Sequence, residues 1–246
     1  MRTGTRTPFP VLVFCACLAL RASAGAAAEK AESGKPAAKA PPAASKTVPS
    51  PLPAIDRAHT ALLVMDYQND IVGMMPEAAR APLLDKAAEA IKAARQAHLP
   101  ILYIVVRFRD GYPEISRENK RFAMLKESGR LREGTPGAEI HDRVAPQKGD
   151  IVVTKRRVGA FSTTDLASIL RAKDIHTLAM FGIATSGVVL STVRWAADMD
   201  YPLIVVSDAS ADADPEVHRV LMEKVLPTQA TVVTTEEFVK AAAKAK

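Results

Sequence analysis

Two residues of opposite charge directly follow apolar runs, where they could carry acid–base chemistry. Asp66 follows Leu-Leu-Val-Met (62–65), and Lys155 follows Ile-Val-Val-Thr (151–154). A carboxylate and an ammonium group that meet in a partly buried place shift each other's pKa, which prepares a general acid or base. The structural alternative is a salt bridge that only ties two loops together. The spacing therefore predicts either an acid–base pair or a structural ion pair.

The elements that must position these residues are apolar runs separated by helical patterns. Six runs predict strands, at 60–66, 100–107, 150–155, 175–182, 202–209 and 230–234. Four segments are predicted as helices, at 80–99, 164–173, 188–199 and 215–225. Near-continuous apolar strands that alternate with helices are typical of a parallel sheet covered on both faces. Ligands bind such sheets beyond the carboxyl ends of the strands, which here carry Asp66, Arg107, Lys155, Ala184–Thr185 and Asp208.

The segment 182–201, GIATSGVVLSTVRWAADMDY, predicts a strand that turns through Thr185-Ser186-Gly187 into a helix. The first backbone N–H groups of such a helix form an anion or oxyanion site. Ser186 would need a positioned base to act as a nucleophile, and His176 belongs to the opposite end of the sheet. We therefore expect Ser186 to cap the helix that begins at Gly187.

Three blocks give the chain a wider resemblance. LLVMDYQND, VVTKRRVGAFSTTDL and GIATSGVVLSTVRWAADMDYPLIVVSDASAD, within about Thr60 to Phe238, resemble the isochorismatase-like hydrolase superfamily, which includes nicotinamidases and other cysteine amidohydrolases. The resemblance implies a three-layer α/β/α sandwich around a six-stranded parallel sheet. It also implies assembly into dimers or larger oligomers and a small-molecule substrate.

The resemblance further implies a catalytic Asp, Lys and Cys. Asp66 matches the Asp and Lys155 the Lys, but Val188 occupies the position of the cysteine. A valine cannot form a thioester or any other covalent acyl intermediate. Cleavage of a vinyl ether, as in isochorismatases that lack the cysteine, needs only a proton donor and water. Val188 is compatible with that reaction.

The same resemblance marks the turn before Val188 as part of the site. Ala184, Thr185 and Gly187 match its turn and oxyanion positions, and the Ile183–Ala184 peptide bond is expected to be cis. On the substrate side, Arg107 could bind a carboxylate with its planar guanidinium group, and Phe161 could form a wall of the pocket. Other candidates for these two roles are Arg109, Arg156, Arg157 and Phe108.

We expect no metal and no cofactor. The five histidines, His59, His98, His141, His176 and His218, show no ligand spacing. Nicotinamidases carry an Asp and two His after the second strand, whereas this chain has Asp110 and Glu114 and no His there. Asp208, Asp212 and Asp214 could suggest a cation site, but a helix cap at Asp214 before Pro215 is the simpler interpretation.

The beginning of the chain has the composition of an export signal. Arg2 and Arg6 precede an apolar run over 11–20 and the small residues 22–24, which predicts a signal peptide over 1–24. That run is too short to span a membrane; an uncleaved interfacial anchor or a lipid on Cys17 are the alternatives. We expect a disordered Ala/Pro/Lys-rich linker over 25–53, a hydrolase domain over 54–246, and a secreted or periplasmic protein.

Charge and cysteine content narrow the function further. Both cysteines, Cys15 and Cys17, belong to the leader, so the domain has no thiol nucleophile. The formal charge of +6 falls to about +1 after Lys46, which gives no argument for nucleic-acid binding. Two functions remain: an exported hydrolase that uses Asp66 and Lys155 on a small carboxylated substrate, or an inactive relative that serves as a binding or oligomeric scaffold.

Overall fold

A computed structural model describes residues 52–246 of the chain. The predicted signal peptide and nearly all of the predicted linker lie outside the described residues. Within the described part, no helix is both long enough and apolar enough to cross a membrane.

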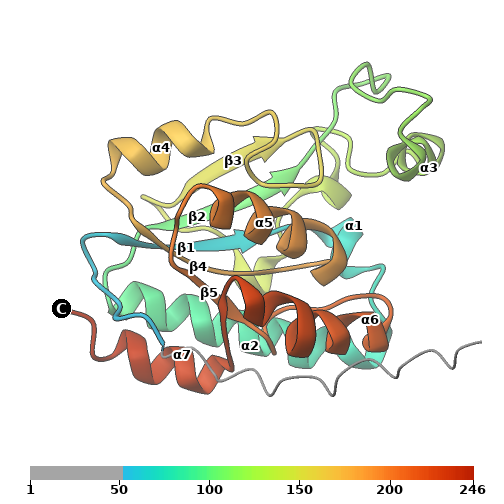
Figure 1. Ribbon diagram of the computed structural model, residues 1–246. Helices are drawn as coiled ribbons and strands as arrows, with labels where there is room; N and C mark the ends of the chain where they lie inside the picture. Colours follow the sequence, from blue (N-terminus) through green and yellow to red (C-terminus); the bar gives the residue numbers. More distant parts are fainter. Residues whose placement is uncertain (1–51) are drawn as a thin grey trace, which may run out of the picture. The chain divides into compact units, whose positions relative to one another are not determined.

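Six parallel strands form a single sheet (Figure 1). Their bounds are β1 Thr60–Met65, β2 Ile101–Val106, β3 Ile151–Lys155, β4 Thr177–Gly182, β5 Leu203–Val206 and β6 Thr231–Val233. The sheet has the order β3-β2-β1-β4-β5-β6, so the chain reverses its direction of winding between β1 and β4. Ligands bind at such a switch point, at the carboxyl edge of the sheet.

Helices cover both faces of this sheet (Figure 1). The helices are α1 Asn69–Val72, α2 Glu77–Gln96, α3 Lys120–Ser128, α4 Leu166–Ala172, α5 Leu190–Asp198, α6 Pro215–Val220 and α7 Thr235–Ala242. Helical turns occupy Pro136–Ala138, Asp142–Val144, Thr185–Val189, Leu221–Val225 and Leu226–Thr228. Side chains of α2 and α7 share one apolar cluster with one face of the sheet, and side chains of α4 and α5 share a second cluster with the other face. The predicted three-layer α/β/α sandwich is confirmed.

The burial of the strands matches their continuous apolar sequences. Every residue of β1 and β2 is buried, because both strands lie inside the sheet and are covered on both faces. Along β1 the side chains alternate between the clusters: Leu62 and Val64 pack with α2, whereas Leu63 and Met65 pack with α5. All six predicted strands are present with shorter bounds, and the largest difference is in β5, which was predicted over 202–209 and spans Leu203–Val206.

The predicted helices differ from the structure at their ends. The helix predicted over 188–199 begins with a π-helical turn, Thr185–Val189, and the one over 215–225 changes to a π-helical turn at Leu221. The predicted cap at Asp214 is confirmed, since its carboxylate accepts hydrogen bonds from the N–H groups of Glu216 and Val217. Three helices, α1, α3 and α7, were not predicted.

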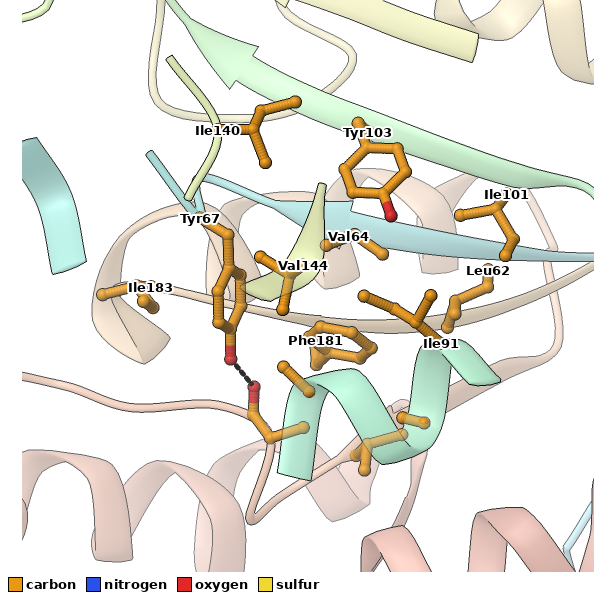
Figure 2. Close-up of a cluster of buried hydrophobic side chains, with 14 of the residues drawn as sticks. Leu62, Val64, Tyr67, Ile91, Ile101, Tyr103, Ile140, Val144, Phe181 and Ile183 are labelled. Atoms are coloured by element: carbon orange, nitrogen blue, oxygen red, sulfur yellow. Dashed lines mark hydrogen bonds between the residues drawn. The ribbon is translucent and has the colours of Figure 1, made fainter. Parts of the chain in front are cut away.

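Tyr67 anchors the chain just beyond β1 to the core (Figure 2). Its ring lies 5.6 Å from that of Phe181 in an edge-to-face arrangement, and its hydroxyl donates a 2.6 Å hydrogen bond to the carbonyl of Ala209. An apolar body with a satisfied hydroxyl is the arrangement that a buried tyrosine requires. The residue next to Asp66 is thereby fixed from the β5 side of the sheet.

Candidate active site

Asp66 and Lys155 form a buried ion pair at the carboxyl edge of the sheet. Lys155 Nζ donates a 2.8 Å hydrogen bond to Asp66 Oδ2, and the two side chains are only 1% and 7% exposed. The residues end β3 and follow β1, so the lysine side chain reaches across β2, a span of about 10 Å at normal strand spacing. The expected convergence of the two charges is present.

Burial shifts both groups towards their neutral forms. It raises the pKa of Asp66 above its ordinary value of 3.8, while Lys155 and Arg121 oppose that rise. It also lowers the pKa of Lys155 from 10.5, and Asp66 opposes that fall. A carboxyl whose pKa is raised by burial keeps its proton to a higher pH than a free carboxyl does, and a neighbouring cation stabilises the carboxylate that forms when the proton is given up. The pair is therefore equipped for proton transfer.

One oxygen of Asp66 is left without a protein partner. Lys155 bonds to Oδ2, whereas Oδ1 is buried and has no hydrogen-bond partner among the described residues. A buried carboxylate oxygen without a partner is costly in free energy. This oxygen is therefore a candidate to bind water or a substrate in the site. Asp66 also adopts a left-handed backbone (φ 60°), which Asp tolerates better than most residues.

The polar residues after Asp66 hold the surrounding loops. The Gln68 amide, fully buried, donates to the carbonyls of Val106 and Ala138 and accepts from the N–H of Val106. Asp70 Oδ2 accepts a 2.8 Å bond from the N–H of Leu131. The motif DYQND thus supplies one candidate catalytic group and several anchors, which explains its concentration of polar residues.

The turn after β4 is built differently from our expectation. The Ile183–Ala184 peptide bond is cis, as the resemblance implied. Ser186 does not cap the helix with its side chain; that prediction was wrong. Instead its N–H donates a 2.7 Å bond to Asp212 Oδ2, because the loop after β5 brings a carboxylate to the start of the helix.

The backbone groups expected to bind an oxyanion are partly occupied. Thr185 N–H donates to the carbonyl of Ala211, and Gly187 N–H donates to the carbonyl of Ala184. The carboxylate of Asp212 already takes the N–H of Ser186. These bonds occupy the N–H groups of Thr185, Ser186 and Gly187, so these three groups are already engaged within the protein.

Val188 fills the position where the resemblance implies a cysteine. Its side chain is 1% exposed and packs in the apolar cluster shared with α5. A Cβ added to Gly182 would lie 3.1 Å from Val188 Cγ1, so the contact between the two is tight. Val188 thus presents only a hydrocarbon side chain to the site and has no nucleophilic group that could attack a substrate.

A cavity of about 300 Å³ joins these parts, a volume suited to a small molecule. Its charged and polar lining residues are Asp66, Arg121, Lys155, Ser186 and Asp212. The remaining lining is apolar and includes Ile71, Met75, Phe122, Val158 and Val188. A larger hollow of about 770 Å³ lies between residues 52–56 and α7, but it contains none of the groups described above. The smaller cavity, which contains Asp66 and Lys155, is therefore the candidate active site.

Arg121 was missed by the sequence analysis. It lies in the first turn of α3, which stands beyond the carboxyl ends of the strands (Figure 1). Its guanidinium group borders the turn at Gly187, since a Cβ added there would lie 3.1 Å from Arg121 Nη2. Among residues 52–246, no ion pair or side-chain hydrogen bond involves Arg121. The Asn119 cap of α3 was a possible signal for the helix, but not for its position over the site.

The arginines named from the sequence are engaged in other contacts. Arg107 does not line the cavity; its guanidinium group donates to the carbonyl of Ala138 and pairs with Glu139 at 2.8 Å. Three others, Arg109, Arg156 and Arg157, contact Glu114 through its carboxylate or its carbonyl. Arg107 does not reach the cavity because its two partners, Ala138 and Glu139, lie in the segment between α3 and β3.

The two aromatic residues named from the sequence belong to packing contacts. Phe161 stacks on Trp195 of α5 with ring centroids 6.4 Å apart, and Phe108 packs against Phe122 and Tyr112. Neither Phe161 nor Phe108 lines the cavity. Phe122, which was not predicted, supplies the aromatic wall.

One histidine approaches the turn from α6. Thr185 Oγ1 and His218 Nδ1 are 2.8 Å apart, and burial lowers the pKa of His218. Thr185 itself is fully buried and does not line the cavity. The contact therefore positions the turn, and sequence spacing gave no sign of it.

The fold and the site together define an α/β protein with an acid–base pair in a small-molecule cavity at the switch point of its sheet. Residues 60–237 match the Isochorismatase domain, and the chain belongs to the isochorismatase family. The curated relatives include the ureidoacrylate amidohydrolase RutB of Stutzerimonas stutzeri (strain A1501), 33% identical over 189 residues, which cover 68% of this chain and 75% of that protein.

Solved structures agree with this assignment. A cysteine hydrolase from Pseudomonas syringae pv. phaseolicola 1448A has a TM-score of 0.70 at 24% identity, over 80% of this chain and all of that chain, which supports the fold. The N-carbamoylsarcosine amidase from Thermoplasma acidophilum has a TM-score of 0.60 at 25% identity, over 72% of this chain and 97% of that chain. The ureidoacrylate amidohydrolase and the N-carbamoylsarcosine amidase are hydrolases by name, in line with an enzyme rather than a scaffold.

Proposed function

We propose that this chain is a hydrolase without a covalent step, acting on a small carboxylated substrate, with Asp66 as the acid–base group. The observation that carries the proposal is the cavity-lining carboxyl of Asp66: one oxygen bonds to Lys155, and the other has no partner among the described residues. Lys155 stabilises the carboxylate that remains after Asp66 has given up its proton.

Arg121 supports the carboxylate part of the proposal. It lines the same cavity as Asp66 and is not engaged in an ion pair within residues 52–246. A guanidinium group presents several donors in a fork that matches a carboxylate, so it binds and orients such a group better than an ammonium does. The apolar side chains between Arg121 and the ion pair would hold the rest of a small substrate.

Vinyl-ether cleavage is the reaction that best fits Val188. Asp66 gives its proton to a carbon of the double bond, and the electron pair of that bond forms the new C–H bond. Water then adds to the resulting oxocarbenium ion, and the hemiketal breaks into a carbonyl compound and an alcohol while Asp66 regains a proton. No nucleophile of the protein is needed at any step.

Amide or ureide hydrolysis is the second candidate. It is favoured by the relative named a ureidoacrylate amidohydrolase, at 33% identity. In this chain the attacking group would be water activated by Asp66, since Val188 cannot form an acyl intermediate. The candidates share the same residues and differ in the bond that breaks.

A substrate panel tests the proposal. The domain is incubated with carboxylated vinyl ethers, amides and ureides, and denaturing mass spectrometry of the protein during turnover searches for a covalent adduct. The proposal expects turnover of one class without any adduct. Turnover of none of the three classes would favour the scaffold alternative, and an acylated protein would contradict the water mechanism.

Export and assembly into oligomers remain proposals that rest on the sequence pattern and the resemblance. Cell fractionation tests export, and we expect the protein outside the cytoplasm. Light scattering of the purified protein tests assembly into oligomers, and we expect a mass of at least two chains. A cytoplasmic protein or a monomer would contradict them.

A further inference from the structure

Two histidines meet at the amino edge of the sheet, opposite the candidate active site. His59 directly precedes β1 and His176 directly precedes β4, and these strands pair with Thr60 opposite Thr177. The N–H group of His176 donates a 2.8 Å bond to the carbonyl of His59. The imidazole rings are 5.1 Å apart between centroids. Paired backbones therefore hold the rings together, although the two histidines lie 117 positions apart in the chain, which hides the pair from any search for ligand spacing.

Asp174 completes a three-residue cluster. Its Oδ2 lies 3.3 Å from His59 Nδ1 and its Oδ1 lies 3.1 Å from His176 Nε2. One ligand atom from each of the three residues lies within 4.8 Å of the others. Asp174 sits in the turn after α4 with a left-handed backbone (φ 55°), which an Asp accepts readily.

We propose that His59, Asp174 and His176 form a binding site for a divalent transition-metal ion of the Zn²⁺ type. Bonds of 2.0–2.2 Å in tetrahedral geometry place ligand atoms about 3.3 Å apart. The two contacts between Asp174 and the histidines, each made by a different carboxylate oxygen, have similar lengths of 3.3 and 3.1 Å. Two imidazole nitrogens with one carboxylate suit Zn²⁺ or its neighbours, whereas Mg²⁺ and Ca²⁺ prefer sites made of oxygen alone. Water would supply the remaining ligand.

The present hydrogen bonding identifies what the ion displaces. His59 Nδ1 donates a 2.8 Å bond to the carbonyl of Asp174, so the ion replaces a proton at that nitrogen. The three side chains are 38% to 71% exposed, so the ion can enter from solvent without opening the fold. Bound there, it would join the start of β1 to the turn between α4 and β4, which makes it a structural ion distant from Asp66.

Titration of Zn²⁺ into the chelator-treated full chain tests this site, with the chain prepared without an affinity tag, with Cys15→Ser and Cys17→Ser to remove the two thiols, and with binding followed by calorimetry. We expect one ion per chain, a rise in melting temperature with Zn²⁺, and neither effect with Mg²⁺. Asp174→Asn and His176→Asn should each weaken binding by at least about ten-fold. His98→Asn is the matched control, since His98 is an exposed histidine in the turn before β2, and it should bind Zn²⁺ as the unchanged chain does.

A second measurement covers the case in which a variant folds poorly. Imidazole ¹⁵N resonances of the unchanged chain should shift on Zn²⁺ addition for His59 and His176 and stay in place for His98. Absence of binding at millimolar Zn²⁺, equal binding in the two variants and the control, or shifts confined to other histidines would each overturn the proposal.

Discussion

Asp66 and Lys155 lie 89 positions apart in the chain, and a 2.8 Å hydrogen bond joins their buried side chains, which line the same cavity. The bond exists because β3 and β1 end at the same edge of the sheet with only β2 between them. Burial makes each charge costly, and pairing offsets part of that cost. The remaining oxygen of Asp66 is what the pair can offer to a substrate.

The pH dependence of turnover should respond to Lys155. Burial raises the pKa of Asp66, and Lys155 opposes that rise, so Lys155→Met should raise the pKa further. Because the protonated carboxyl donates in the proposed reaction, kcat/KM falls as the pH rises through this pKa. The descending limb of the pH profile should therefore move to higher pH in Lys155→Met. The exposed Lys148→Met is the control, and a limb that stays in place in both variants would speak against the coupling.

Substrate affinity should depend on Arg121. Arg121→Gln removes a charge-assisted contact worth about 1.5–3 kcal/mol, so KM for a carboxylated substrate should rise roughly 10- to 100-fold with little change in kcat. A neutral ester of the same substrate should show no such change. Arg117→Gln alters another exposed arginine of the same segment and should leave KM alone. An equal effect of Arg121→Gln on acid and ester would refute carboxylate recognition.

A thiol at position 188 should face the cavity. Val188→Cys should be alkylated by iodoacetamide, whereas Val189→Cys, equally buried but outside the cavity lining, should react much more slowly. We expect a stability loss of about 1 kcal/mol for the smaller side chain and a gain of amide hydrolysis from the new nucleophile. Peptide mass mapping locates the label. Equal labelling at both positions would contradict the described cavity.

Gly137 should be sensitive to a single methyl group. A Cβ there would lie 2.2 Å from Asp70 Oδ1, while Asp70 Oδ2 holds the N–H of Leu131 at 2.8 Å. Gly137→Ala should therefore cost about 1–3 kcal/mol in urea unfolding. In the Asp70→Ala background the same change should cost clearly less, because the clashing group is gone. The same cost in both backgrounds would show that the contact is unimportant.

The features that could be predicted from the sequence are those that depend on the strands alone. Buried parallel strands leave a continuous apolar run, and the residue after each run must lie at the carboxyl edge, so Asp66 and Lys155 could be named in advance. The positions of Arg121 and His218 depend on how helices approach that edge. No local pattern encodes that approach. The pair of His59 and His176 was hidden for another reason, since the pairing of β1 with β4 joins residues that lie far apart in the sequence.

Some of what was missed did leave a signal. Thr234 and Glu237 form a reciprocal capping box that opens α7, a pattern readable in Thr-Thr-Glu-Glu. By contrast, Arg107 stood at the end of a strand as expected and still turned away from the cavity, because Glu139 and the carbonyl of Ala138 bind it. A strand-end position places the backbone, and neighbouring charges decide where a long side chain goes.

The central claim is that the carboxyl of Asp66 moves the proton in catalysis. Its most direct test is the turnover of Asp66→Asn on whichever substrate the panel identifies, beside Asp110→Asn, which removes a carboxylate from an exposed surface pair with Arg132. Asn keeps the size of the side chain but cannot transfer the proton. We predict a loss of about 10²- to 10⁴-fold in kcat for Asp66→Asn and none for Asp110→Asn. Full turnover by a correctly folded Asp66→Asn would contradict the account.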